Sequence, residues 1–487
     1  MITTQQSLAL SSYSELYDLL VPKDNILRQI HDLVDFQFVY TELVQKYTLD
    51  NGRPAEDPIR MFKYLLLKTI FDLSDVDVVS HTLYDLSFKY FIDLAPEETN
   101  LIHPSSLTKF RRMRLKDMDL LDLLINKTVS IAIEHGIIKG KTIILDATHT
   151  AARSNPHNPL EVLRMRSKRL RHVVYKINED MRNQMPAKNT DDDIVCELDY
   201  CNALINTIED CADVSQVPAV NEKLNLLKEC VEDIIERFTI STDKDARIGH
   251  KTEDTSFFGF KSHIALEEDS RIVTAAVVTS GDCGDGPQMQ TLIDKTINAG
   301  IAVDKVIGDT AYAGKYNIEE AAQKGITVYA KLHPHCYGVR QNDQDFVFNK
   351  DANRYICPAG HMAIKCKTEN RKDGRSRRLR YIFDEKKCSI CKLRDTCLQK
   401  GAKHRVYNVV TDEFPIQRKQ FEQSDEFKQV YSERYKIEAK NAELKNVYGY
   451  DRALYYGIDA MQLQSATTIF VANLKRIIKL KSNQNNH

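Results

Sequence analysis

The sequence has no tryptophan, no long apolar run and no excess of charge of either sign, and the last two absences exclude classes of protein. A helix that crosses a membrane needs about 20 consecutive apolar residues, and no stretch approaches that length. The N-terminus lacks a basic segment followed by an apolar one, so we expect a cytoplasmic protein without an export signal. The formal net charge is −1, so composition alone does not indicate binding to nucleic acid.

The 487 residues exceed one typical hydrophobic core, so we expect several domains. Helical spacing of apolar residues before residue 135 and short apolar strands after it predict a helical N-terminal domain and an α/β core with two insertions. The predicted boundaries are 1–135 for the helical domain, 136–154 and 250–332 for the core, 155–249 for a helical insertion, 333–420 for a cysteine-rich insertion, and 421–487 for C-terminal helices that complete the core.

Two short apolar strands of the predicted core end in an aspartate. Ile143–Leu145 precedes Asp146, and the strand that begins at Val303 precedes Asp309. Functional side chains gather at the carboxyl ends of strands in α/β folds, and a buried carboxylate without a role is uncommon because its desolvation must be offset. The order strand, insertion, two strands, helix, strand, helix and strand matches a mixed sheet of the RNase H-like type.

A third acidic position lies on a predicted helix near the end of the chain. Ser424 is a suitable N-cap, Gly449 is a suitable end, and no proline or glycine lies between them, so we expect one helix. Side chains spaced three, four and seven residues apart share one face of such a helix, within roughly 60° of one another. They are Tyr431, Arg434, Glu438 and Lys445. The alternative for this helix alone is a solvated face with charge pairs.

Three carboxylates from separate elements suit hard divalent cations. We expect Asp146, Asp309 and Glu438 to be catalytic and to bind two Mg²⁺ or Mn²⁺ ions. Mg²⁺ prefers oxygen ligands, and two such ions stabilise the attacking and leaving oxygens of an in-line phosphoryl displacement. For each acid alone, a structural role is an equal alternative. The residues of the helix face that we expect to contact DNA are Tyr431, Arg434 and Lys445.

Two basic segments are further candidates for contact with DNA. The first is a predicted helix that Ser105 or Ser106 caps, and a capped basic helix after other short helices suits a DNA backbone or groove. Its predicted DNA-binding residues are Lys109, Arg111 and Arg112. The second is a predicted hairpin between paired cysteines, with Arg375, Arg377 and Arg378. The alternatives are a solvated basic face for the helix and a solvated loop for the hairpin.

Five of the eleven cysteines lie between Cys357 and Cys397. In a chain without an export signal this clustering favours a metal over disulfides. Cys388 and Cys391 form a tight chelating turn, and Cys357 and Cys397 complete a predicted tetrahedral Zn²⁺ site that would stabilise the insertion. Alternative ligands are His361 and Cys366. Free buried thiols and an iron–sulfur cluster are the other interpretations.

Together these motifs resemble a bacterial insertion-sequence transposase of the DDE class. More narrowly, residues 431–445 are similar to the group with the signature Tyr-x2-Arg-x3-Glu-x6-Lys, and they match its spacing without adjustment. Asp146 in Leu-Asp-Ala-Thr resembles the first acid of the family, and Asp309 in Gly-Asp-Thr-Ala-Tyr-Ala-Gly resembles the second. The segments Phe258–His263 and Thr279–Asp285 also resemble family motifs.

The resemblance implies an RNase H-like enzyme that binds the terminal inverted repeats of an insertion sequence, hydrolyses a phosphodiester at each end, and joins the 3′-hydroxyl to target DNA. A homodimer is expected because two ends must be paired, and a DNA enzyme of this kind is expected in the bacterial cytoplasm, associated with the nucleoid. Some members use a tryptophan to hold a flipped base, so here either Tyr312 stacks on the base or that intermediate is not formed. The alternatives are a zinc-containing, non-catalytic regulator derived from a transposase and a nuclease without strand transfer.

Overall fold

The computed structural model describes most of the chain. The described residues are 11–47, 55–116, 118–154, 158–237, 243–251, 255–333, 346–370, 377–398, 401–410 and 413–485. Within these ranges no helix combines the length and the apolar character that a membrane span requires.

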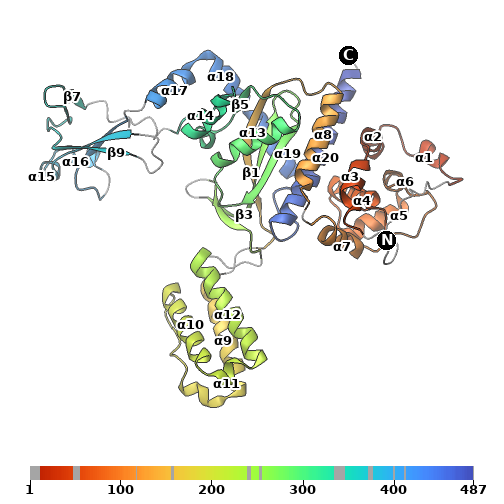
Figure 1. The fold of residues 1–487 in the computed structure, drawn as a ribbon, viewed down its shortest axis with the longest axis horizontal. Coiled ribbons are helices and arrows are strands. Elements are labelled where there is room, and N and C mark those ends of the chain that lie inside the picture. The colour runs from red at the N-terminus through yellow and green to blue at the C-terminus, as the bar shows by residue number, and fades with distance from the viewer. Residues whose placement is uncertain are drawn as a thin grey trace.

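A six-stranded mixed sheet forms the centre of the fold (Figure 1). Its strands are β1 (Thr142–Ala151), β2 (Arg247–His250), β3 (Ser256–Glu267), β4 (Val273–Ser280), β5 (Lys305–Ile307) and β6 (Thr327–Tyr329). β1 pairs with β3 in antiparallel and with β5 in parallel orientation, and β6 continues the parallel side. β2 and β4 both pair with β3 in antiparallel orientation. The predicted mixed α/β fold is confirmed.

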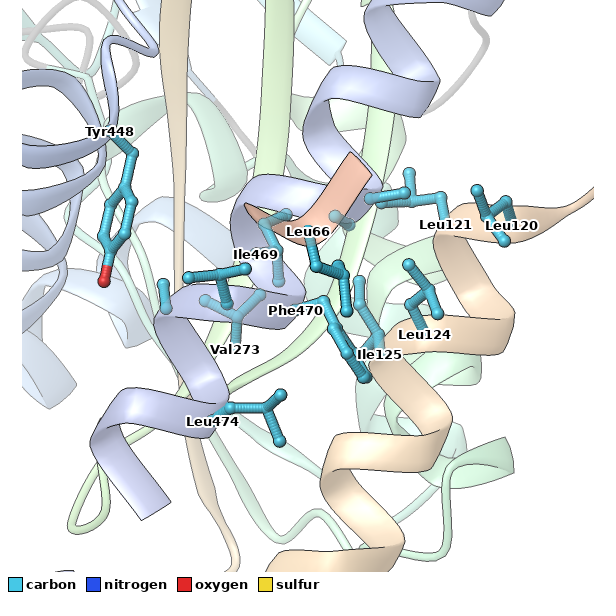
Figure 2. Close-up of a cluster of buried hydrophobic side chains, with 14 of the residues drawn as sticks. Leu66, Leu120, Leu121, Leu124, Ile125, Val273, Tyr448, Ile469, Phe470 and Leu474 are labelled. Carbon is cyan, nitrogen blue, oxygen red and sulfur yellow. The ribbon is translucent and has the colours of Figure 1, made fainter. Parts of the chain in front are cut away.

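Helices cover both faces of this sheet. They are α8 (Leu120–Glu134), α13 (Met289–Asn298), α14 (Lys315–Gln323) and α20 (Ile458–Asn485). Successive strand residues point to opposite faces, so Ile143 and Leu145 pack against α13 and α14, whereas Ile144 lies in the core with α8 and α20. Figure 2 shows part of that second core, where Leu124 of α8 lies near Phe470 of α20. The two cores fix the position of β1.

The N-terminal region is helical, as predicted. Its helices are α1 (Glu15–Leu20), α2 (Ile26–Leu33), α3 (Gln37–Val44), α4 (Pro58–Phe71), α5 (Asp75–Tyr84), α6 (Leu86–Phe91) and α7 (Ser105–Met113). Ser105 is the first residue of α7 and its side chain does not cap the helix, so the predicted cap is wrong. The rings of Phe62 in α4 and Phe470 in α20 are 6.4 Å apart and belong to one hydrophobic core. The predicted boundary at residue 135 therefore does not separate two cores.

Two groups of elements extend from the sheet (Figure 1). The helical group contains α9 (Pro159–Ile177), η1 (Glu179–Asn183), α10 (Ile194–Glu209), α11 (Ala212–Ser215) and α12 (Pro218–Arg237), and it has a hydrophobic core of its own. The cysteine-rich group contains β7 (Val347–Asn349), β8 (Arg354–Ile356), β9 (Lys365–Asn370), β10 (Arg377–Ile382), α15 (Glu385–Ser389), α16 (Arg394–Cys397) and β11 (Val406–Val410). β9 and β10 are antiparallel neighbours, as the predicted hairpin requires.

The predicted C-terminal helix is divided in two. Its two parts are α18 (Asp425–Ser432) and α19 (Tyr435–Tyr448), and a further helix, α17 (Glu413–Gln423), precedes them. Ser424 caps α18 by accepting from the Phe427 N–H, and Gly449 ends α19 with a φ of 62°, as predicted. The prediction of one continuous helix is wrong, because the N–H groups of Glu433 and Arg434 bond to carbonyls three residues back. These bonds form a tightened turn between α18 and α19.

Candidate active site

Asp146 and Asp309 occupy equivalent positions relative to two adjacent parallel strands, β1 and β5. Ile144 of β1 pairs with Ile307 of β5, and each aspartate follows its residue of this pair by two positions. The structure therefore brings the two predicted acids together. β1 continues to Ala151, so the predicted end of the strand at Asp146 is wrong, whereas Asp309 does follow the end of β5.

A third aspartate, Asp285, lies in the loop after β4, and its charge acts on both members of this pair. The Asn317 side chain donates to the carbonyl of Gly286 over 2.9 Å and to the carbonyl of Tyr312 over 3.4 Å, which joins the loop to the turn after Asp309. Lys261 of β3 forms an ion pair of 3.0 Å with Asp285. The sequence had indicated Asp285 only as part of a motif shared with a family, without a role.

The aspartates repel one another electrostatically. Burial raises the pKa of Asp146 to about 6, and the charges of Asp309 and Asp285 add to this effect. Burial also raises the pKa of Asp309, again with a contribution from Asp285. Arg434 acts in the opposite direction on the pKa of both Asp146 and Asp309. Buried carboxylates that raise one another's pKa values favour the binding of a cation, because the cation relieves their repulsion.

Tyr312 is a buried side chain whose pKa the same three aspartates affect. Its side chain is 1% exposed, and its hydroxyl has no hydrogen-bond partner in the described part of the chain. Burial raises its pKa, and Asp285, Asp146 and Asp309 raise it further. The predicted alternative in which Tyr312 stacks on a base does not fit this conformation, because the ring is inaccessible.

Glu438, the predicted third acid, lies on the surface of α19. Its side chain is 54% exposed and accepts from Arg434 in an ion pair. Lys445 is half-buried on the same helix, and the charge of Asp146 acts on it: burial and Lys251 lower the pKa of Lys445, and Asp146 raises it. The charges of Arg434 and Lys445 therefore both interact with charges of the aspartates.

Tyr431 belongs to α18 and not to the helix that carries Glu438. Its ring stacks on Phe427, with 5.4 Å between centroids and an interplanar angle of 15°. The Lys331 ammonium lies 4.9 Å from the Tyr431 ring centroid. Tyr431 thus packs at the junction of α18 with the sheet.

Asn441 of α19 is a site residue that the sequence analysis missed. Its Nδ2 donates to Oδ2 of Asp146 over 2.9 Å. It lies one helical turn beyond Glu438 and one before Lys445, within the interval that the signature leaves unspecified. A single asparagine inside a helix gives no signal in one sequence, so only the spacing relative to Glu438 could have indicated it.

No three His, Cys, Asp or Glu side chains of the described residues are grouped closely enough to hold a metal ion. For the acidic group the donor chemistry nevertheless fits a divalent cation, since the donors are carboxylate oxygens whose repulsion a cation would relieve. A preformed site with Asp146, Asp309 and Glu438 in contact is not present.

The four predicted zinc ligands line one cavity of about 580 Å³. They are Cys357, Cys388, Cys391 and Cys397. Burial raises the pKa of Cys397, and the other three thiols of this group raise it further, as expected for neighbouring thiols. His361 also lines the cavity, and Cys366 does not. Four thiols that line one cavity fit Zn²⁺ in chemistry, although the described residues contain no preformed group of three metal ligands.

The basic residues predicted to bind DNA fall into different environments. Lys109 and Arg112 of α7 are exposed. Arg111 is 9% exposed, donates to both oxygens of Asp75, and lies 4.9 Å from the ring centroid of Tyr455. Arg111 therefore connects helices of the protein. Of the hairpin residues, Arg375 lies outside the described residues, and Arg377 and Arg378 lie on β10.

Comparisons with known proteins identify two regions of the chain. Residues 15–113 match the family described as "Transposase domain (DUF772)", and residues 212–474 match the family described as "Transposase DDE domain". The second match covers more than half of the chain. No curated protein matches the sequence significantly. A solved structure of the piggyBac transposase synaptic complex with hairpin DNA aligns with 93% of this chain and 78% of its own, at 9% identity and a TM-score of 0.28.

Proposed function

The chain belongs to the family of transposases with a DDE domain, and we propose that it is the DNA-cleaving and DNA-joining enzyme of an insertion sequence. In this function it binds the terminal inverted repeats of the element and hydrolyses a phosphodiester at each end. It then joins the freed 3′-hydroxyls to target DNA. Asp146, Asp309 and Glu438 are the proposed catalytic acids.

One observation carries the proposal. Asp146 and Asp309 follow paired residues of parallel strands by the same two positions, and burial raises the pKa of both carboxyls. A structural role would favour partners that neutralise such carboxylates fully, whereas here Arg434 offsets the raised pKa values only in part and a third aspartate, Asp285, increases the repulsion. Buried carboxylates kept in this state are typical of functional sites.

The family uses divalent metal ions, and we propose that Asp146 and Asp309 hold Mg²⁺ or Mn²⁺, with Glu438 as a further ligand. When bound, two such ions would activate a water molecule and then the 3′-hydroxyl. Arg434 and Lys445 lie beside these acids and supply positive charge for the oxygens of the phosphate. Arg434 has to leave Glu438 for that task, since it forms an ion pair with Glu438 in this structure.

The other parts of the chain have proposed roles in holding DNA. The mixed sheet, with its antiparallel and parallel sides, is proposed to be an RNase H-like core. Exposed Lys109 and Arg112 of α7, together with Arg377 and Arg378 of β10, are proposed to contact the DNA backbone. The cysteine-rich group is proposed to bind one structural Zn²⁺. Two copies of the chain are proposed to pair the two ends.

The test is an assay with labelled element ends, a plasmid target, and Mg²⁺ or Mn²⁺. We expect the wild-type protein to nick and join the ends, and Asp146→Asn, Asp309→Asn and Glu438→Gln each to abolish cleavage while end binding persists. Asp304→Asn is the control, because Asp304 is a surface residue beside β5 that pairs with Lys141 over 3.4 Å. Cleavage retained in one of the three variants would remove that residue from the catalytic group.

The same assay separates the alternatives. A protein that binds the ends and neither cuts nor joins them is a regulator derived from a transposase, and this outcome refutes the proposed enzymatic activity. A protein that cuts the ends without joining them to the plasmid is a nuclease. The joined product therefore decides in favour of the proposed function.

A further inference from the structure

We infer that Asn441 is a positioning residue that fixes the orientation of the Asp146 carboxylate beside the face of α19 that carries Glu438. This inference rests on the proposed function, because it concerns how the acids of that site are arranged. It assigns Asn441 no contact with the reacting atoms.

The geometry begins with one hydrogen bond between distant parts of the chain. Asn441 Nδ2 donates to Asp146 Oδ2 over 2.9 Å, although 295 positions separate the two residues. Helix residues three apart are neighbours on one face, so the face that carries Asn441 also carries Glu438. The bond therefore orients the carboxylate of the first acid from the helix that carries the third, although the two acids lie on separate elements.

The orientation of the Asn441 amide follows from its surroundings. If the amide were reversed, its oxygen would face the Asp146 carboxylate and the two would repel each other, so Nδ2 must point to Asp146. Oδ1 then points away, is buried, and has no hydrogen-bond partner among the described residues. A buried polar atom left without a partner is a cost that native structures rarely keep without a reason. The position of Asn441 is thus determined by Asp146.

α19 does not depend on Asn441 for its attachment to the fold. Ile437 and Leu444 of this helix are fully buried in the main core, and Gly449 ends the helix in a left-handed conformation. Removal of the Asn441 amide therefore leaves the helix in place and releases the carboxylate of Asp146. Outer residues that orient metal ligands typically contribute about 10–100-fold to metal affinity or activity.

The test compares Asn441→Ala and Asn441→Leu with wild-type protein; leucine keeps the branching of asparagine at Cγ, is larger, and lacks the amide. Asn446→Ala is the matched control, because Asn446 is an exposed asparagine of the same helix. Binding of Mn²⁺ is measured by electron paramagnetic resonance, with and without end DNA, and cleavage is measured over a series of Mn²⁺ concentrations. Thermal unfolding checks the fold.

We expect both Asn441 variants to bind Mn²⁺ about 10-fold more weakly and to regain cleavage as the Mn²⁺ concentration rises. Asn446→Ala is expected to match wild type. Unchanged Mn²⁺ affinity in the Asn441 variants overturns the inference, whether cleavage is normal or falls together with the melting temperature. In both of those cases cleavage by the wild-type protein leaves the proposed function intact, whereas a wild type that binds no Mn²⁺ and cuts no DNA refutes both.

Discussion

Arg434 donates to the Glu438 carboxylate across one turn of α19, and its charge also lowers the pKa of Asp146 and of Asp309. One guanidinium therefore acts on all three acids that the sequence indicated. It provides positive charge at the proposed cation site. Because Arg434 stands at the start of α19, directly after the tightened turn, small changes in that turn would move it relative to the acids.

The first prediction concerns Arg434. Arg434→Ala is expected to lower the rate of end cleavage by about 10²–10³, the usual cost of removing one preorganised donor to a developing charge. Arg434→Lys should fall between this variant and wild type, because lysine keeps the charge and loses the planar fork. Lys436→Ala is the control: Lys436 lies on the same helix and pairs with Glu433 over 2.7 Å. Equal rates for Arg434→Ala and the control would show that Arg434 has no role in cleavage.

The second prediction is that the site reduces the stability of the metal-free protein. Burial raises the pKa of Asp146 in the folded chain from its ordinary value of 3.8 to about 6, so the charged carboxylate opposes folding above pH 6 and this effect vanishes below about pH 4. Asp146→Asn should therefore stabilise the protein at pH 7 by up to about 3 kcal/mol and give no gain at pH 4.

This stability difference is measured by unfolding of both proteins in EDTA at the two pH values. Asp304→Asn serves as the control for the loss of an exposed aspartate near the same strand. A variant of Asp146 that is less stable than wild type at pH 7 would mean that the carboxylate is already neutralised in the folded chain.

The sequence predicted those features that local patterns determine. Ser424 and Gly449 begin and end the C-terminal helical segment because an N-cap hydroxyl and a glycine in the left-handed region are local requirements. The proximity of Asp146 and Asp309 was also predictable, since each comes after a short apolar run of an α/β core, although Asp146 lies within β1 and not at its end.

Features that depend on distant partners were not predictable from one sequence. Asn441 and Asp285 gain their importance from residues far along the chain, so neither spacing nor composition identifies their roles. Arg111 stays a predicted DNA contact, but its ion pair was not predictable, because the charge run of α7 does not indicate that Asp75 lies opposite. The turn at Glu433 contains no proline or glycine, and it arises from a shift in backbone hydrogen bonding that leaves no mark on the sequence.

The third prediction separates the two neighbouring arginines of α7. Burial tends to raise the pKa of Asp75, but hydrogen bonds from Arg111 and Lys68 outweigh it and lower the pKa to about 2. The pair therefore stabilises the fold at neutral pH, and this contribution is lost as the pH falls from about 4 to 2. Arg111→Ala should destabilise the protein by about 2 kcal/mol at pH 7.

Arg112→Ala is the matched variant, because Arg112 is exposed on the same helix. It should leave unfolding unchanged and weaken end binding, with a smaller dependence of affinity on salt concentration. Both variants are compared by thermal unfolding and by binding titrations at two salt concentrations. Weakened binding in Arg111→Ala alone, at unchanged stability, would restore Arg111 as a DNA contact.

The fourth prediction concerns the cysteine-rich group. Purified protein should contain about one zinc per chain by elemental analysis, and Cys388→Ser should lose it because Cys388 lines the cavity with the other three thiols. Cys366→Ser should retain zinc, since Cys366 lies on β9 outside that lining. Zinc bound by four thiolates would stabilise a group whose own hydrophobic core is small. Equal zinc contents in the two variants would exclude this assignment, and absence of zinc from the wild-type protein would leave the thiols as packing residues.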